Sequence, residues 1–505
     1  MPDPCGAGHG HRHRNARRGA AMSAAPGRPK QARIAGVVEG TPVSAVDLVI
    51  VGAGPAGLAA GVAARELGLS VILLDDQEAP GGQIYRNIED NLRRCTDAGL
   101  GADYLRGAGL VRRFRDCGAQ YLARSMVWQV DADGSVYYSR MGRSHRLAAA
   151  CVLLATGAME RPPLAPGWTL PGVMTVGAAQ IMQKTAQALP AKDVWIAGCG
   201  PLALYYAASL ARQGVRLAGF LDTAVPSNRR VAVRHWAGAL RRAAYLAKGV
   251  GYLARLRLSS VPYFGGVTAL EIQGEERVQA IRWKSRHGWQ ERPAQGVLLH
   301  EGVVPHTQLA QAIGCAHVWD EHQACFRPVV GTGGVTSIDR ILVAGDCAGI
   351  GGARAAELQG RLAAGEAAAR LGRLGATARV DWSADTERQL VREMAIRPFL
   401  DALYLPREEV RLPPDVQLVC RCESVTAGQV REAVRSGCRT VDGVKSQLRC
   451  GMGPCQGRVC GLPVAALVAD ERDIAPDAVG PLRLRPPIRP ISLDELAHLA
   501  VASEG

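Results

Sequence analysis

The chain has 505 residues, 48% hydrophobic and 21% charged, a balance that excludes a fibrous or largely disordered protein. At about 150 residues per domain, this length predicts about three domains. The formal net charge is +14, and residues 1–33 supply six of these charges, because they contain seven Arg and Lys residues and one acidic residue, Asp3. The rest of the chain is only mildly basic, so we predict no nucleic-acid partner.

The first 45 residues contain no apolar run, and a secretory or export signal is therefore not indicated. We predict that residues 1–45 form a disordered basic extension. Residues 46–64 are apolar enough to suggest a membrane span, but their glycines and Asp47 favour a strand, a turn and a helix. We therefore predict a cytoplasmic protein with no membrane span.

A dinucleotide-binding fingerprint follows a predicted strand at residues 47–51 and opens a predicted helix that continues to Leu67. The turn consists of Gly52, Gly54, Pro55, Ala56 and Gly57. Its glycines permit the tight turn, the approach of a pyrophosphate to the backbone, and close packing of the helix on the strand. A second predicted strand at residues 71–74 ends at Asp75, whose carboxylate can accept hydrogen bonds from a ribose. This order of features predicts a bound dinucleotide.

Three further segments indicate which dinucleotide binds: PGGQIYR directly after the acid, ATG after an apolar run, and VAGD near residue 345. Their order and spacing resemble the flavoproteins with two dinucleotide-binding domains. The resemblance implies FAD, with the GGQ segment lining the flavin, the ATG segment passing beside the cofactor, and the aspartate of VAGD contacting its ribityl or pyrophosphate part. The residues that carry over by position are Gly81, Gly82, Gln83, Thr156, Gly157, Gly345 and Asp346.

A second fingerprint repeats this pattern, with predicted strands at residues 193–197 and 215–221 and a helix at residues 201–212. Its turn and acid are Gly198, Gly200, Ala203 and Asp222. An acid with no Arg directly after it favours NAD or another adenosine nucleotide, such as ATP, over NADP. The repeat predicts a second nucleotide-binding domain, and whether its site is occupied stays open.

Six of the fourteen cysteines lie between residues 420 and 460. A C-x-C pair and a C-x₄-C pair comprise Cys420, Cys422, Cys455 and Cys460. Between the pairs we predict one helix with a capping box at Thr426 and Gln429, and a second helix capped by Thr440. The glycine-rich loop at residues 451–457 lets backbone N–H groups approach sulfur, as at iron–sulfur clusters. We predict [2Fe–2S]; zinc, which favours C-x₂₋₄-C pairs, and unligated thiols remain alternatives.

The remaining candidate side chains carry no motif. Cys438 and Cys450 are predicted to be packing or surface residues, and the sequence has no C-x-x-C pair that would indicate a redox disulfide. For His300 and His306 no acid partner is assignable, so a structural role is predicted. We predict no catalytic residue.

The segments VCRCESVT and GMGPCQGRVC, after ATGAMERP and VAGDCAGIGGARAA, resemble one flavoprotein family. It comprises the alpha or A subunits of opine oxidases and of heteromeric proline and hydroxyproline dehydrogenases, and the B subunit of hydrogen cyanide synthase. The resemblance covers about residues 46–500 and implies a C-terminal domain of the bacterioferritin-associated-ferredoxin (BFD) type, with the four paired cysteines as cluster ligands. Gln447 and Cys450 stand where the motif more often has Thr and Ala.

The same resemblance implies a function and partners. The chain would be an electron-transfer subunit that passes electrons from a partner to an acceptor. The partner would be a D-amino-acid-oxidase-like beta subunit that oxidises the amine. Further implications are FMN at a subunit interface and a small ferredoxin-like gamma subunit. Two alternatives stay open: a stand-alone reductase in which NAD(P)H at the second site reduces FAD, and a second domain that binds ATP or another nucleotide structurally.

We therefore predict an α/β protein with two Rossmann-like domains, the second inserted in the first, and a small C-terminal helical [2Fe–2S] domain. The expected divisions are an FAD-binding domain at residues 46–165 and 295–375, a second nucleotide-binding domain at 166–294, a connector at 376–414, a cluster domain at 415–475 and a Pro-rich tail at 476–505.

Overall fold

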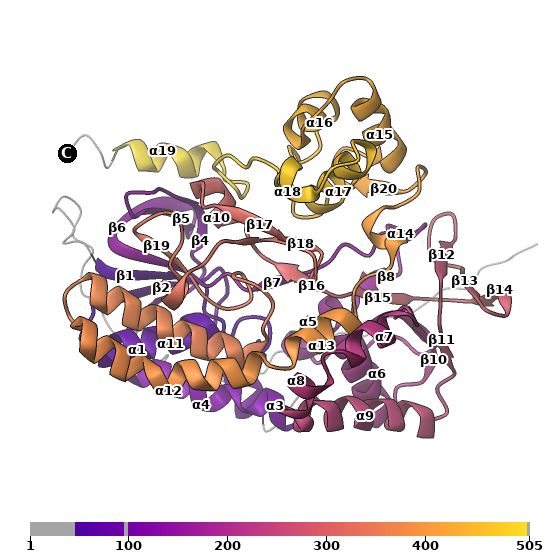
Figure 1. Cartoon of the computed structure of the whole chain (residues 1–505), viewed down its shortest axis with the longest axis horizontal. Helices are drawn as coiled ribbons and strands as arrows, with labels where there is room; N and C mark the ends of the chain where they lie inside the picture. The colour runs from indigo at the N-terminus through magenta and orange to yellow at the C-terminus, as the bar shows by residue number, and fades with distance from the viewer. Residues whose placement is uncertain (1–45, 95–98, 502–505) are drawn as a thin grey trace, which may run out of the picture. The chain divides into compact units, whose positions relative to one another are not determined.

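The computed structural model describes residues 46–94 and 99–501, and the predicted extension at residues 1–45 lies outside them. A seven-stranded sheet forms the first domain (Figure 1). Its strands are β1 (Val46–Val51), β2 (Val71–Leu74), β3 (Gln120–Leu122), β4 (Met126–Val130), β5 (Ser135–Arg140), β6 (Arg143–Leu154) and β19 (Ile341–Val343). β1 lies parallel between β2 and β6, and β19 pairs with β6. The strands predicted at residues 47–51 and 71–74 are confirmed.

Both faces of this sheet are covered, which explains why its strands are continuous apolar runs. Leu48 and Ile50 of β1 pack among the helices on one face, whereas Val49 and Val51 pack on the other face. The helices of this domain are α1 (Pro55–Glu66), α2 (Ile88–Arg93), α3 (Ala102–Leu105), α4 (Gly107–Asp116) and α11 (Ala353–Arg370). A β-carbon on Gly360 of α11 would lie 2.0 Å from a backbone oxygen of α1, so these two helices touch backbone to backbone.

The second domain has a five-stranded parallel sheet in the order β11-β10-β9-β15-β8. Its strands are β8 (Val173–Thr175), β9 (Val194–Cys199), β10 (Leu217–Asp222), β11 (Tyr263–Gly265) and β15 (Val297–Glu301). Its helices are α5 (Val176–Ala186), α6 (Pro201–Arg212), α7 (Asn228–Val233), α8 (Trp236–Leu240) and α9 (Ala243–Leu258). The helix predicted at residues 201–212 is confirmed. Strand pairing places β15 in this sheet, so the chain returns to the first domain after Glu301 rather than at residue 295.

Smaller elements link the two sheets. A meander packs beside the second sheet: β12 (Ala269–Gln273), β13 (Ala280–Ser285) and β14 (Gly288–Pro293). The chain leaves the first domain through β7 (Ala158–Glu160). It returns through β16 (Val303–Pro305), α10 (Gln308–Ile313), β17 (His317–Asp320), β18 (Cys325–Pro328) and η1 (Thr332–Gly334). β7 pairs with β16, so the chain leaves and re-enters the first domain along one two-stranded ribbon.

The predicted connector is largely helical, with α12 (Ala376–Met394), α13 (Arg397–Leu403) and α14 (Glu408–Arg411). α12 packs on α11, and a β-carbon on Gly365 would lie 2.4 Å from the ring of Trp382. The prolines of this segment lie only in its second half, from Pro398 onward. α12 is therefore part of the first domain's helical layer.

The cluster region contains β20 (Leu418–Cys420), β21 (Val425–Thr426), α15 (Ala427–Arg435), α16 (Val441–Leu448), α17 (Gly461–Glu471) and α18 (Pro476–Val479). The capping box of Thr426 with Gln429 and the cap at Thr440 are confirmed. The tail runs back to the first sheet, where the amide of buried Ile488 donates to the carbonyl of Trp128, and it ends in α19 (Leu493–Val501). Over the described ranges, the structure has no helix with the length and hydropathy that crossing a membrane requires.

Candidate functional site

The first fingerprint forms a tight turn from β1 into α1. A β-carbon on Gly52 would lie 2.4 Å from the carbonyl oxygen of Ala155, and one on Gly57 would lie 1.9 Å from that of Gly52. Gly54, the N-cap residue of α1, differs from these two: its nearest neighbour would be the α-carbon of Gly82, 3.9 Å away. The space beside Gly54 at the helix N-terminus therefore fits the pyrophosphate of a dinucleotide.

Asp75 holds this turn from the end of β2. Its Oδ2 accepts the amide of Ala53 at 2.5 Å, and its Oδ1 accepts the amide of Gln77 at 2.8 Å. Burial raises the pKa of Asp75, and these two hydrogen bonds oppose the rise. Each carboxylate oxygen keeps a further lone pair, so Asp75 can also accept a ribose hydroxyl.

The GGQ segment lies directly on the turn. The amide of Gly81 donates to the carbonyl of Ala53 at 2.9 Å, and a β-carbon on Gly82 would lie 2.6 Å from the α-carbon of Gly54. The side-chain amide of Gln83 reaches toward the carbonyl of Ala158 in β7 at 3.5 Å. The structure thus joins segments that lie 75 residues apart along the chain.

The ATG and Gly-Asp segments complete this side of the site. Thr156 donates to the carbonyl of His306 at 2.8 Å, and a β-carbon on Gly157 would meet no atom within 4 Å. Gly345 lies against Ala56, the second residue of α1. Asp346 accepts the amides of two glycines before α11, at 2.9 and 2.8 Å. The open space at Gly54 and Gly157, next to the N-termini of α1 and α11, fits FAD.

Lys184 of α5 is a buried cation that the sequence did not indicate. Its side chain is 3% exposed, and its Nζ donates to the carbonyl of Gln83 at 2.9 Å and to Gln180 at 2.8 Å. None of the described carboxylates forms an ion pair with it. Burial lowers the pKa of Lys184 to about 7. Charge near a flavin tunes its electronics, and Lys184 contacts the GGQ segment through the carbonyl of Gln83.

Replacing Lys184 with Met should stabilise the flavin-free protein below pH 7. The buried lysine titrates at about 7 in the folded state and near 10.5 when unfolded, so the unfolded state binds more protons between these values. The wild-type free energy of unfolding therefore gains up to about 1.4 kcal/mol per pH unit from this residue. The advantage of Lys184→Met should shrink as pH rises, as measured by urea unfolding at pH 6 and pH 9.

The exposed Lys192 provides the matched control for this prediction. Lys192→Met should leave the pH dependence of unfolding at its wild-type slope. Equal slopes for wild type and Lys184→Met would show that the buried ammonium does not carry this pH dependence.

His300 has an acid partner, Glu160, which the sequence does not indicate. Its Nδ1 lies 2.7 Å from Oε1 of Glu160, whose Oε2 accepts the amide of Gly177 at 3.0 Å. Glu160 lies in β7 and His300 in β15, 140 residues apart, so no local motif shows the pair. The pair, of which His300 is buried and Glu160 partly buried, lies where the chain crosses between the two domains.

The second fingerprint is folded as predicted, and its carboxylate accepts one hydrogen bond on each oxygen, as that of Asp75 does. A β-carbon on Gly198 would lie 2.0 Å from the carbonyl oxygen of His300. The packing of the two strands is therefore enough to require glycine at this position. At Asp222, Oδ1 accepts the amide of Ala224 at 3.0 Å, and Oδ2 accepts the hydroxyl of Tyr263. Gly200 and Ala203 open α6, as the motif requires.

The segment between α13 and α14 lies across the ends of β9, β10 and β15. The carbonyl of Tyr404 lies 4.0 Å from the sulfur of Cys199, the residue between the two glycines of the turn. Arg407 forms a buried ion pair with Glu301 at 3.0 Å, and Asn228 donates to the carbonyl of Leu405 at 3.0 Å. Nucleotides bind at the carboxyl ends of such strands, so the chain itself fills part of this crevice.

The four paired cysteines lie together in the C-terminal domain as neighbouring pairs. Cys422 lies against Cys455, and Cys420 against Cys460. Among the described residues, no three His, Cys, Asp or Glu side chains surround one point as ligands of a single ion. Thiols in pairs suit [2Fe–2S], in which four thiolates are shared between two irons. A β-carbon on Gly453 would lie 2.2 Å from that of Cys422, so the loop needs glycine there.

The two remaining thiols of this region differ from each other. Cys438 is half-buried, and its sulfur lies 2.8 Å from the side-chain oxygen of Gln447. Cys450 is buried against both Cys420 and Cys460. Cys438 therefore contacts Gln447 rather than a predicted ligand, whereas Cys450 packs directly on two of the predicted ligands.

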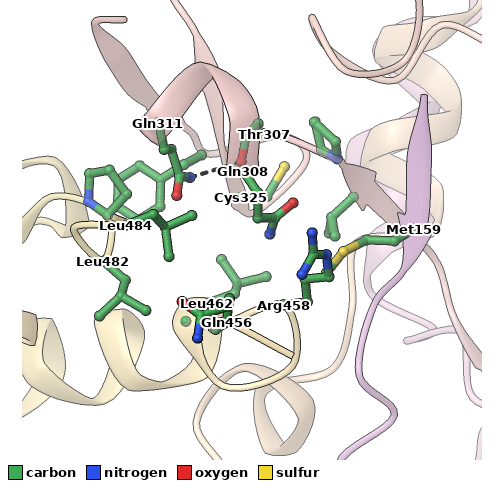
Figure 2. Close-up of a pocket in the computed structure, with 16 residues that line it drawn as sticks. Met159, Thr307, Gln308, Gln311, Cys325, Gln456, Arg458, Leu462, Leu482 and Leu484 are labelled. Atoms are coloured by element: carbon green, nitrogen blue, oxygen red, sulfur yellow. Dashed lines mark hydrogen bonds between the residues drawn. The ribbon is translucent and has the colours of Figure 1, made fainter. Parts of the chain in front are cut away.

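His306 joins the ATG segment to the cluster loop. Its amide donates to the carbonyl of Gly157 at 3.0 Å, and its Nε2 accepts Nε of Arg458 at 3.2 Å. Arg458 also donates to the carbonyl of Cys455 at 3.0 Å. Burial and the neighbouring arginines lower the pKa of His306 to about 3, so it is neutral at physiological pH. Figure 2 shows the adjoining pocket, where Arg458 and Met159 face each other.

Comparisons with known proteins agree with this geometry. The family described as pyridine nucleotide-disulphide oxidoreductase matches residues 46–364, and the BFD-like [2Fe-2S] binding domain matches residues 418–470. The A subunit of opine oxidase from Agrobacterium tumefaciens (strain Ach5) is 42% identical over 465 residues, which cover 90% of this chain and 92% of the relative. Hydrogen cyanide synthase subunit HcnB of Pseudomonas aeruginosa is 33% identical over 469 residues, which cover 89% of this chain and 98% of the relative. The resemblance stated from the sequence is confirmed.

Among solved structures, L-proline dehydrogenase from P.horikoshii superposes with a TM-score of 0.66 at 19% identity, covering 90% of this chain and 79% of that one. This likeness concerns the fold, and it agrees with the predicted α/β architecture. The predicted FAD-binding and [2Fe–2S]-binding domains are confirmed by the family matches.

Proposed function

We propose that this chain, which belongs to the family of opine oxidase A subunits within the pyridine nucleotide-disulphide oxidoreductases, serves the oxidation of a secondary amine such as an opine or a hydroxyproline. The chain is an FAD-dependent oxidoreductase and the electron-transfer subunit of a heteromeric dehydrogenase. A flavin exchanges two electrons with a substrate or carrier, and an iron–sulfur cluster passes them singly. The observation that carries the proposal is the presence of both cofactor domains in one chain, joined through His306 and Arg458.

The residues of the first fingerprint and of the GGQ, ATG and Gly-Asp segments would hold FAD. Gly54 leaves room for the pyrophosphate, Asp75 would accept the ribose, and Lys184 would set the charge behind the flavin. Cys420, Cys422, Cys455 and Cys460 would bind the cluster. We assign no proton-transfer residue, because the amine is oxidised in the partner subunit in this proposal.

We infer that the partner is a D-amino-acid-oxidase-like beta subunit, with FMN at a subunit interface and, as a further component, a small ferredoxin-like gamma subunit. What supports other subunits is that the relatives are themselves named as subunits. We further propose that the assembly is cytoplasmic. The test is dye reduction with candidate amines, by the purified chain alone and by the chain with its partners. Activity only in the presence of the partners is expected, and amine-dependent reduction by the chain alone would refute the proposal.

We propose that the second nucleotide site does not admit NADH, because the chain occupies its crevice with Tyr404 and Arg407. Anaerobic mixing of the isolated chain with NADH should leave the flavin absorbance unchanged over seconds. NADPH should behave in the same way. Rapid bleaching of the flavin by either nucleotide would instead support a stand-alone reductase.

A structural nucleotide in the second domain is a separate alternative. Mass spectrometry of the ligands released on denaturation distinguishes it. FAD as the only adenosine nucleotide is expected, because Tyr404 and Arg407 fill the crevice of the second domain. Stoichiometric recovery of ATP or NAD would show that the second domain holds a nucleotide despite these contacts.

A further inference from the structure

An uninterrupted basic stretch follows the second fingerprint. Between Asp222 and Glu271 the chain has no acidic residue. Residues 228–258, here called the basic segment, comprise α7, α8 and α9 (Figure 1). Its eight cationic residues are Arg229, Arg230, Arg234, Arg241, Arg242, Lys248, Arg255 and Arg257. This charge is concentrated in 31 residues of a chain whose other described parts mix both signs.

α9 has two apolar faces, and only one of them is packed. Leu253 and the buried Leu256 lie against the core that includes α6. The other face is a stripe at spacings of three and four residues, so its members share one side of the helix. The stripe consists of Ala243, Ala247, Val250, Ala254 and Leu258, all of them exposed. Val250 is 65% and Leu258 89% exposed. No described element covers this stripe.

α7 and α8 also carry exposed apolar side chains. Val233 lies in α7, and Trp236 and Leu240 lie in α8, which packs beside α9; all three are exposed, Trp236 by 58%. Tryptophan is the side chain most typical of the boundary between apolar and aqueous phases. So many exposed apolar groups within one segment of 31 residues indicate a binding surface rather than ordinary scatter.

Most of the cations of the basic segment lack acidic partners. Arg242 pairs with Glu393, and Lys248 pairs with Asp103. The other six form no ion pair with any carboxylate in the described part of the chain. Lys248 and Arg255 flank the stripe of α9 on one side, and Arg257 flanks it on the other side. An apolar stripe between rows of cations is the pattern of a helix that lies in a membrane interface.

We propose that the basic segment docks the protein on an anionic phospholipid surface. The stripe of α9 and Trp236 would enter the headgroup region, and the unpaired arginines would contact lipid phosphates. A protein partner fits less well, because closing such an interface would remove six arginines from water unless the partner supplied as many acids. The proposal is independent of the amine oxidised and of the partner subunits proposed above.

Vesicle sedimentation tests this proposal with the full chain carrying its flavin and cluster. In about 0.1 M salt, the protein should sediment with vesicles of phosphatidylcholine containing roughly 30% phosphatidylglycerol and should stay in solution with pure phosphatidylcholine. Raising the salt to about 0.5 M should release it, because screening shortens the reach of the charges. Val250→Ser with Leu258→Ser, and separately Arg255→Glu with Arg257→Glu, should each reduce the bound fraction at least about tenfold.

Matched controls distinguish vesicle binding through this surface from binding through charged or exposed apolar side chains elsewhere. Val416→Ser removes a side chain that is 81% exposed outside the basic segment, and Arg112→Glu with Arg113→Glu changes the net charge equally. Both controls should bind vesicles as the wild type does, and every variant should keep its flavin absorbance. Equal binding to both lipids, binding unaffected by the variants, or no binding would overturn the proposal. So would variants that release a partner subunit or a second copy of the chain, since the segment would then be a protein interface.

Discussion

Replacing Cys455 with Ser should remove the visible iron–sulfur absorbance and the iron of the purified protein. Cys455 lies in the glycine-rich loop against Cys422, and four thiolates are needed to complete the coordination of two irons. Serine keeps the volume of the side chain but binds iron far more weakly than a thiolate. The measurement is iron and sulfide content together with the electron paramagnetic resonance spectrum of the reduced protein.

Cys438 is the matched control for this experiment, because its sulfur contacts Gln447 rather than a predicted ligand. Cys438→Ser should keep the cluster and its spectrum. Cys450 suits this purpose less well, since it packs against Cys420 and Cys460. FAD content should be unchanged in both variants. Zinc without iron after anaerobic expression, or full cluster absorbance in Cys455→Ser, would contradict the assignment.

The apolar core of the cluster region limits how strongly the loss of the cluster destabilises the protein. Val430, Val444 and Leu467 are buried together without any contribution from a metal. Leu482 of the tail covers the cluster loop, because β-carbons on Gly451 and Gly457 would each lie 2.4 Å from it. We therefore expect Cys455→Ser to lower the melting temperature of the C-terminal region without unfolding the first domain.

Local features of the site could be predicted from the sequence because each is coded within a few residues. The turn from β1 to α1 needs glycine at fixed positions, and the capping box at Thr426 needs only its own helix. The residues missed were those that depend on distant packing. Lys184 reaches Gln83 across 101 positions, and nothing near it in the sequence distinguishes it from a surface lysine.

The same dependence on distant packing limits what the sequence predicts about ligand binding at the second nucleotide site. Its glycines and acid satisfy the fingerprint, and the strand and helix form as the pattern predicts. The contacts that fill the crevice come from Tyr404 and Arg407, some two hundred residues later. A motif can specify a local fold, but whether a ligand can enter depends on what the rest of the chain packs against it.

Replacing Gly54 with Val should abolish FAD binding while leaving the first domain folded. The backbone of Gly54 has φ −78° and ψ −176°, a conformation open to any residue, and a β-carbon there would meet nothing closer than 3.9 Å. The valine side chain would therefore occupy the space that the pyrophosphate needs, and its β-carbon would displace no protein atom. We expect FAD affinity to fall at least about a hundredfold, or roughly 2.7 kcal/mol. Flavin absorbance per protein and titration of the stripped protein with FAD measure this loss.

Gly109 of α4 is the control that distinguishes this cause from a general effect of losing a glycine. No atom lies within 4 Å of a β-carbon placed there, and it faces no proposed cofactor contact. Gly109→Ala should keep its FAD and should stabilise the exposed helix by up to about 1 kcal/mol, because alanine favours the helical state over glycine. The circular dichroism of Gly54→Val should match that of the flavin-free wild type. Retention of FAD by Gly54→Val would place the pyrophosphate elsewhere and would remove the basis for the proposed roles of Asp75 and Asp346.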